Sequence, residues 1–219
     1  MVGARALDPV AHGYHGSKKG ERETWTTGEF GSSHAGAVGV LLADGTVPAP
    51  VVFLSSSGSD SRSVSEWTVY DGEPHGGPRA AVLRGVCSCG WTGPGHTIDW
   101  DEIADREAKV AGGGLASACY GDWDTHIGEV ARSAVPVPET INGLLDQLDQ
   151  EIEKVGKDAP LAAVRAVRRL EVLAAQCAYG PAREVAQDLT PEQAAAAIGL
   201  NEEEARRHLA RLGCFSLYC

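Results

Sequence analysis

The sequence predicts an α+β protein: a small antiparallel β-rich domain, then an all-helical domain that ends in a helix-turn-helix unit. Three observations support this prediction. Between residues 36 and 135, short apolar segments are separated by Asp-Gly, Gly and Pro turns, which is typical of antiparallel strands. The segment Val135-Pro-Val-Pro138 then forms a stiff linker. From residue 136 to residue 219, apolar residues recur at helical spacing.

The composition of the 219-residue chain allows a buried core and limits the kinds of partner. Hydrophobic residues make up 43% of the chain, which is enough for one large or two small domains. The formal net charge of −11 excludes a surface that is basic throughout, so any contact with nucleic acid must be local. Arginine outnumbers lysine by 14 to 5, a bias typical of GC-rich genomes such as those of actinobacteria.

Neither a membrane span nor a signal peptide is predicted. No apolar segment approaches the length of a transmembrane helix, and the first residues lack a continuous apolar core. We therefore expect a cytoplasmic protein without membrane association. In that compartment, the six cysteines should be free, buried or metal-bound rather than paired in disulfides.

The elements before the linker follow from local patterns. Residues 1–35 are rich in Gly, Ser, His and charge, so we expect a mobile arm there. Alternation and turn signals predict two strands within 37–57, one at 64–70 and one at 79–89. Residues 100–109 and 122–130 are expected to be helical, with a break at Gly112 to Gly114.

Two apolar stripes after the linker predict a helical hairpin from Pro138 to Gln176. The first stripe runs from Ile141 to Val155 and the second from Leu161 to Leu173. The pair could pack locally on its own domain, or residues 138–176 could form a homodimer interface. Gly180-Pro181 should end the second helix, and a short helix should follow at 182–187.

The segment from Leu189 to Leu212 is predicted to form two short helices joined by a glycine turn. Thr190 and Gln193 form a capping box, Gly199 ends the first helix, and Asn201 with Glu204 begins the second. The spacing of Ala195, Gly199 and Ala205 resembles the helix-turn-helix of bacterial regulators and sigma-factor DNA-binding regions. The resemblance covers about two dozen residues and implies DNA binding.

A transcriptional regulator that binds DNA is therefore the leading functional hypothesis. Base contacts are expected from Glu202, Glu203, Arg206 and Arg207, and phosphate contacts from Arg211 and Arg183. The adjacent glutamates oppose this, and residues 159–219 carry seven Arg and seven acidic residues. The alternatives are a helical pair without nucleic-acid contact, an acidic interaction module that docks on a transcription or phage partner, and a sensor whose N-terminal domain binds a ligand.

Cys87 and Cys89 are the second notable feature. Two residues apart on a strand, they would face the same side, although zinc sites usually use Cys-x2-Cys. The simplest interpretation is a pair of small buried thiols beside Trp91. A structural zinc site completed by His126 and by His96 or Cys119 is a second interpretation, and redox sensing is a third.

The same stretch resembles a CxCGWxG segment followed by W-x-x-H in uncharacterised actinobacterial proteins. The matching residues are Cys87, Cys89, Gly90, Trp91, Gly93, Trp123 and His126. The resemblance spans the middle of the chain. It implies a shared fold and carries no activity with it.

The sequence does not predict an enzyme. It contains no G-x-S-x-G elbow, phosphate-binding loop, H-E-x-x-H or Rossmann fingerprint. Asp99, Asp101 and Glu102 are interpreted as the solvated start of a helix, where acidic residues complement the helix dipole.

Overall fold

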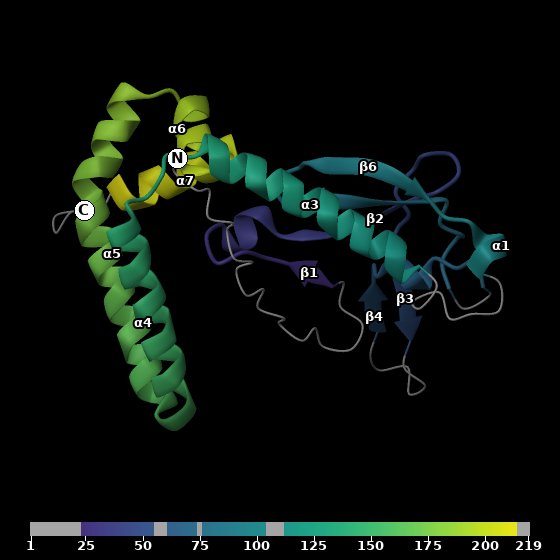
Figure 1. Cartoon of the computed structure of the whole chain (residues 1–219), viewed down its shortest axis with the longest axis horizontal. Coiled ribbons are helices and arrows are strands. Elements are labelled where there is room, and N and C mark those ends of the chain that lie inside the picture. The colour runs from purple at the N-terminus through teal and green to yellow at the C-terminus, as the bar shows by residue number, and fades with distance from the viewer. Residues whose placement is uncertain (1–22, 55–60, 74–75, 104–111, 214–219) are drawn as a thin grey trace, which may run out of the picture. The chain divides into compact units, whose positions relative to one another are not determined.

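The computed structural model describes residues 23–54, 61–73, 76–103 and 112–213 (Figure 1). It confirms the predicted α+β class, because antiparallel sheets occupy residues 24–97 and helices dominate residues 113–213. The chain divides into two compact units, an N-terminal unit of Met1–Glu129 and a C-terminal unit of Val130–Cys219. Within the described ranges, no helix combines the length and apolar character that a membrane crossing requires.

The N-terminal unit is built on a four-stranded antiparallel sheet with strand order β1-β2-β5-β6. A second, two-stranded sheet pairs β3 with β4. The bounds of the six strands are β1 Thr24–Trp25, β2 Gly36–Leu41, β3 Val51–Leu54, β4 Ser61–Val64, β5 Val82–Cys87 and β6 Thr92–Thr97. The strands are accompanied by the 3-10 helices η1 (Gly31–His34) and η2 (Trp67–Val69) and by the helices α1 (Trp100–Ile103) and α3 (Gly113–Ser133).

The core of this unit lies between the sheet and α3. Along β5, buried and half-buried residues alternate, as expected for a strand with one covered face. On α3, Cys119, Trp123 and Ile127 are buried at intervals of four residues, which places them on one side of the helix. A Cβ atom at Gly85 would lie 2.7 Å from the carbonyl oxygen of Cys119, so only glycine allows α3 to approach β5 this closely.

Several predictions for the N-terminal unit differ from the structure. Of the expected mobile arm, residues 1–22 lie outside the described residues, but 24–25 form β1 and 31–34 form η1. The strand expected at 64–70 is replaced by the end of β4 and by η2. The predicted break at Gly112–Gly114 is wrong for Gly113 and Gly114, because these two residues begin α3. Strand β6 was not predicted, because its sequence TGPGHT lacks β-branched and aromatic alternation.

After α3, the described part of the C-terminal unit contains four helices, α4 (Glu139–Asp158), α5 (Pro160–Asp188), α6 (Pro191–Ile198) and α7 (Glu202–Gly213). The predicted hairpin is present as α4 and α5. The expected break at Gly180-Pro181 is wrong, because α5 continues through Pro181 to Asp188. Packing of α5 against α7, with Ala182 buried, outweighs the hydrogen bond that proline removes from the helix.

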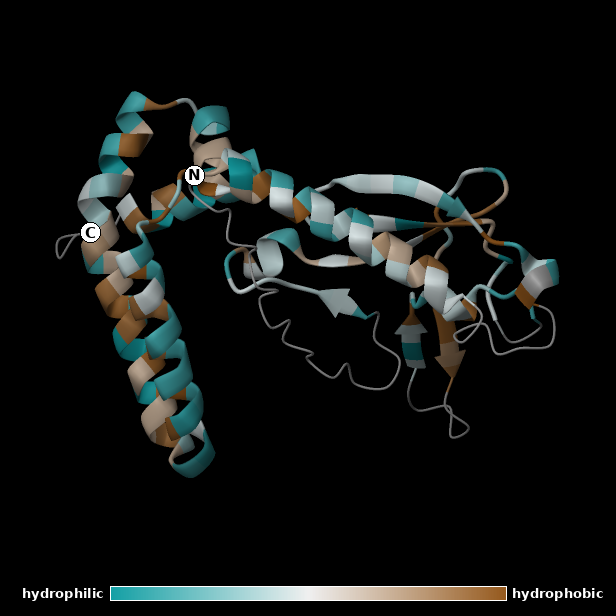
Figure 2. Cartoon of the chain, in the orientation of Figure 1, coloured by the Kyte–Doolittle hydropathy of each residue, from teal (hydrophilic) through white to brown (hydrophobic). Residues whose placement is uncertain are grey.

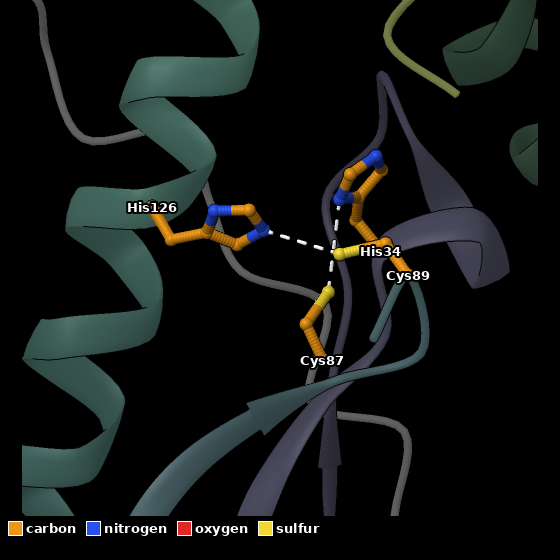
Figure 3. Close-up of side chains that lie close together, drawn as sticks. All are labelled: His34, Cys87, Cys89 and His126. Carbon is orange, nitrogen blue, oxygen red and sulfur yellow. Dashed lines mark hydrogen bonds between the residues drawn. The ribbon is translucent and has the colours of Figure 1, made fainter. Parts of the chain in front are cut away.

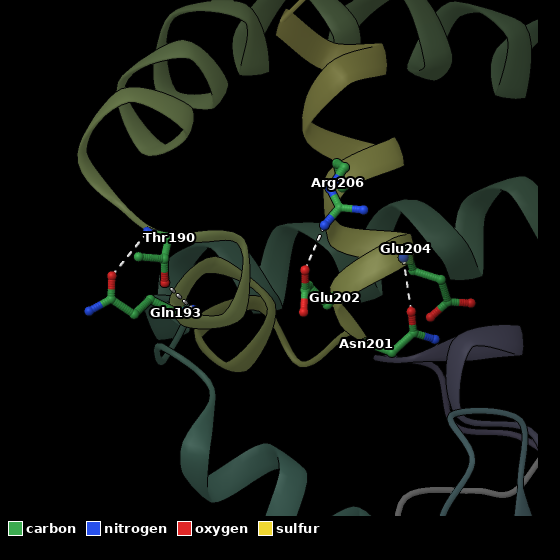
Figure 4. A network of polar contacts seen from close by, with 6 residues as sticks. All are labelled: Thr190, Gln193, Asn201, Glu202, Glu204 and Arg206. Carbon is green, nitrogen blue, oxygen red and sulfur yellow. Dashed lines mark hydrogen bonds and ion pairs between the residues drawn. The ribbon is translucent and has the colours of Figure 1, made fainter.

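The predicted glycine turn between α6 and α7 is confirmed. Thr190 and Gln193 form a complete capping box, with bonds of 3.2 Å and 3.0 Å (Figure 4). Gly199 has a left-handed conformation at φ 66°, and the Leu200 amide donates to the Ala195 carbonyl at 3.0 Å. Asn201 Oδ1 accepts a 2.9 Å bond from the Glu204 amide, but Glu204 Oε2 is buried without a hydrogen-bond partner in the described part of the chain.

Replacing Gly199 by alanine should destabilise the C-terminal unit by about 1–2 kcal/mol, because a Cβ atom strains the left-handed conformation. Gly143 provides the matched control, since it lies inside α4 with open space around its Cα. Its replacement by alanine should stabilise the unit by about 0.5–1 kcal/mol. Chemical denaturation followed by helical circular dichroism measures both. Equal shifts in the two variants would contradict the assigned turn.

Candidate metal centre

Four side chains in the N-terminal unit bring ligand atoms together: His34, Cys87, Cys89 and His126 (Figure 3). Their ring nitrogens and sulfurs all lie within 4.8 Å of one another. Cys87 Sγ is 3.6 Å from His34 Nδ1, and Cys89 Sγ is 3.4 Å from His126 Nε2. This group can hold a metal ion.

A tight turn between β5 and β6 places the two sulfurs side by side. Cys87 is the last residue of β5, and its amide donates to the Trp91 carbonyl at 2.9 Å. The Gly90 amide donates back to the Cys87 carbonyl at 3.0 Å, and Gly90 has a positive φ of 97°. This is the three-residue hairpin loop that requires glycine in its last position. The chain reverses between the two cysteines, and this reversal allows a Cys-x-Cys pair to present both sulfurs to one site.

Ser88, the residue between the two cysteines, connects the turn through hydrogen bonds to the segment that carries His34. Its hydroxyl accepts a 2.9 Å bond from the Ala35 amide and donates a 2.8 Å bond to the Ser32 carbonyl. The Ser88 amide also donates to the Ala35 carbonyl at 2.9 Å. These three bonds flank His34, so the ring is held at the turn before any metal binds.

Two tryptophans fix the remaining geometry. The buried indole of Trp123 donates a 3.2 Å bond from Nε1 to the His34 carbonyl. The indole of Trp91 stacks on the His126 ring with a centroid distance of 4.5 Å and an interplanar angle of 4°. His126 lies on α3 three residues after Trp123, so the helix that closes the core also delivers a ligand.

Burial favours the neutral forms of Cys89 and His126. It raises the pKa of the Cys89 thiol to about 11, so this thiol is protonated at neutral pH. Burial, followed by the nearby His34, lowers the pKa of His126, so the imidazole stays uncharged and its nitrogen remains available to a metal.

Of the five metal ligands considered from the sequence, the structure brings together Cys87, Cys89 and His126. His96 lies elsewhere, because it is in register with Leu83, four residues or about 13 Å along β5 from Cys87. Its Nε2 contacts Asp122 Oδ2 at 2.7 Å and links β6 to α3. Cys119 lies two turns, about 10 Å, before His126 on α3 and is fully buried in the core.

His34 takes the place that those two residues were expected to fill. His34 was assigned to the mobile arm, and no residue next to it in the sequence suggests a metal ligand. The one signal that could have indicated its place was its position two residues before an apolar strand. In the structure, Gly36 at the start of that strand pairs with Cys87. The residues before Gly36 therefore lie beside the turn that carries the two cysteines.

The residues predicted to contact DNA lie on α7, except Arg183, which lies on α5. Arg206 Nη2 contacts Glu202 Oε1 at 2.6 Å, and Arg211 Nη2 lies 3.5 Å from His208 Nδ1. Arg183 donates to the Tyr179 hydroxyl at 3.2 Å. Glu203 and Arg207 are exposed and have no ion pair in the described part of the chain.

Comparison of the chain with models of protein families, with curated proteins and with solved structures finds no match. A functional assignment therefore depends on the geometry and chemistry of these two regions.

Proposed function

We propose that His34, Cys87, Cys89 and His126 bind one zinc ion, which holds the N-terminal unit in its fold. The sulfur–nitrogen distances carry this proposal. In a tetrahedral site with Zn–S of about 2.3 Å and Zn–N of about 2.0–2.1 Å, a sulfur and a nitrogen ligand lie about 3.6 Å apart. The two sulfur–nitrogen distances in the structure are 3.6 Å and 3.4 Å.

The ligand set favours zinc and a structural role. Two thiolates and two imidazoles suit zinc, whereas magnesium and calcium prefer oxygen ligands. Two thiolates also neutralise the charge of Zn²⁺, which suits a site with two buried ligands, His34 and Cys87. Four protein ligands fill the tetrahedron, so no position is left for a reacting water molecule.

Metal analysis of the purified full chain tests the proposal. We expect one equivalent of zinc, and substitution with Co²⁺ should give the visible absorption of a tetrahedral site with two thiolates. Cys89→Ser and His34→Ala should each lose most of the metal. His96→Ala is the matched control and should keep it, because His96 contacts Asp122 instead. Less than half an equivalent of zinc in the unmodified chain would contradict the site.

Zinc binding should release at least one proton per ion at pH 7, because the Cys89 thiol must become a thiolate to ligate the metal. The raised pKa of Cys89 ensures that its proton is still present in the metal-free chain. The apparent affinity should therefore fall as the pH falls, by up to about tenfold per proton for each pH unit. Calorimetric titration in two buffers with different ionisation enthalpies measures the release, and a value near zero would contradict thiolate ligation.

A second function, DNA binding through α7, is supported by the geometry of the glycine turn. The α6–α7 pair is short, tightly turned and packed through small residues, since Ala194, Ala195 and Ala205 are buried. This resembles the arrangement that places a second helix in the major groove. The outer surface of α7 carries Arg206 and Arg207.

The ion pair between Arg206 and Glu202 does not oppose this function. Both side chains are exposed, and such a pair contributes about 0–1 kcal/mol, so contact with a base can replace it. The acidic first turn of α7 does limit affinity for phosphate, which makes binding by a single chain weak.

Fluorescence polarisation with a pool of random-sequence duplexes at low salt tests DNA binding. We expect Arg206→Ala with Arg207→Ala to weaken binding at least tenfold. The control pair Lys157→Ala with Arg168→Ala removes the same charge from the α4–α5 hairpin and should have a smaller effect. Binding that is absent at low salt, or that the α7 variant leaves unchanged, would exclude this function and leave the zinc site unaffected.

A further inference from the structure

The α4–α5 hairpin exposes more apolar surface than two helices can cover. No residue of α4 is buried, and Ala182 is the one buried residue of α5. Large apolar side chains stay exposed along both helices, including Leu144 at 62%, Leu173 at 53%, Val164 at 66% and Val167 at 44%. Figure 2 shows hydrophobic positions in brown along both helices. Amphipathic helices derive most of their stability from packing of the apolar face, so this hairpin needs a further partner.

The hairpin has two sides, which helical spacing separates. One side of α4 carries residues that are spaced at intervals of four and three. They are Leu144, Leu148, Glu151, Val155 and Asp158. Because α5 runs antiparallel to α4, the same side of the hairpin carries Ala162, Ala166, Arg169 and Leu173 at the same spacing. We call this side the Leu144 face. The opposite side, the Val167 face, carries Leu145, Asp149, Glu153, Val164, Val167 and Glu171.

The two faces differ in how they could meet a copy of themselves. A two-fold axis that runs parallel to the helices places α4 of one copy against α5 of the other, at the same level along the hairpin. On the Leu144 face, this sets Glu151 and Asp158 of α4 against the arginines of α5. On the Val167 face, it sets Asp149 and Glu153 against Glu171, where like charges repel.

The charges on the Leu144 face are also available for such a contact. Arg165 lies three residues after Ala162 and four before Arg169, so it shares the Leu144 face. Within the described ranges, no ion pair joins α4 to α5, and none involves Arg165, Arg169 or Asp158. Glu151 contacts only Lys154 of its own helix, at 3.6 Å and in solvent. Charge complementarity therefore selects a second copy of this chain as the occupant of the Leu144 face.

We propose that two copies of the chain associate through their Leu144 faces and form an antiparallel four-helix bundle. The 20 residues of α4 give a contact about 30 Å long. Ala162 and Ala166 on α5 leave room for the larger Val155 of the partner's α4, which lies at the same level of the hairpin. The inference rests on the C-terminal unit and is independent of zinc and DNA binding.

Light scattering and sedimentation of the full chain test the proposal. The unmodified chain should have the mass of a dimer. Leu144→Glu with Leu173→Glu should raise the dissociation constant at least tenfold, and both side chains are exposed, so the hairpin should still fold. Val164→Glu with Val167→Glu places the same charges on the Val167 face and should leave the dimer intact.

Charge reversal separates association from folding. Arg165→Glu with Arg169→Glu should weaken the dimer, and adding Glu151→Lys with Asp158→Lys should restore it. A chain that is monomeric at every concentration would overturn the proposal and leave the hairpin for a different protein partner. Dissociation by the Val167-face variant, or a failure of the second reversal to restore the dimer, would also overturn it.

Discussion

Removal of zinc should unfold the N-terminal unit and leave the helices of the C-terminal unit folded. The ion would join His34 to Cys87, 53 residues later, and Cys89 to His126, 37 residues further on. It would therefore crosslink three segments of the chain. Structural zinc contributes about 10–16 kcal/mol in zinc-finger peptides. A typical domain is stable by about 5–15 kcal/mol. The metal-free N-terminal unit should therefore retain little stability.

The chain allows the two units to be followed separately. All five tryptophans lie at or before Trp123, so tryptophan fluorescence reports on the N-terminal unit alone. Helical circular dichroism reports mainly on α4 to α7. Chelator, or Cys87→Ser, should shift the fluorescence transition and leave most of the helical signal. Cys177→Ser removes an exposed cysteine of α5 and is the control. Coincident fluorescence transitions with and without chelator would exclude a structural metal.

Local sequence signals were sufficient to predict the elements whose structure depends on side chains within the same turn or helix. The capping box at Thr190 and the left-handed Gly199 follow from residue chemistry within one turn, and the structure confirms both. The apolar stripes of α4 and α5 likewise predict a hairpin. Pro181 and β6 show the limit of this reasoning, because tertiary packing and strand pairing override the local preference for a break or a loop.

The candidate metal centre was predictable only in part, because strand register decides which histidine lies beside the two cysteines. The two cysteines are recognisable as a candidate pair in the sequence. Pairing of Gly36 with Cys87 brings His34 close to the turn that carries the two cysteines. Pairing of Leu83 with His96 places His96 away from that turn. Both pairings join segments that are distant in the chain. Residue spacing along the chain therefore could not distinguish the two histidines.

Replacing Trp123 by alanine should destabilise the N-terminal unit by about 3–5 kcal/mol, the usual range for a large aromatic residue in a core. Its side chain is fully buried and packs against the rings of Trp25 and Tyr120, each with a centroid distance of 5.7 Å. The variant also loses the bond from the indole to the His34 carbonyl, so zinc affinity should fall as well. Denaturation monitored by fluorescence of the other four tryptophans, together with a zinc titration, measures the two effects.

Trp123→Phe separates packing from the positioning of His34. Phenylalanine retains much of the apolar contact but has no N–H, which leaves the His34 carbonyl without this donor. We expect a smaller loss of stability than with alanine, accompanied by a clear fall in zinc affinity. Tyr120→Phe is the matched control, because it removes a polar group from the neighbouring ring without touching His34. Gly36→Ala tests the same contact from the strand side, since its Cβ atom would lie 2.5 Å from Trp123 Nε1 and displace the indole. Zinc affinity that is unchanged in both Trp123→Phe and Gly36→Ala would show that the indole supports the core and does not position the ligand.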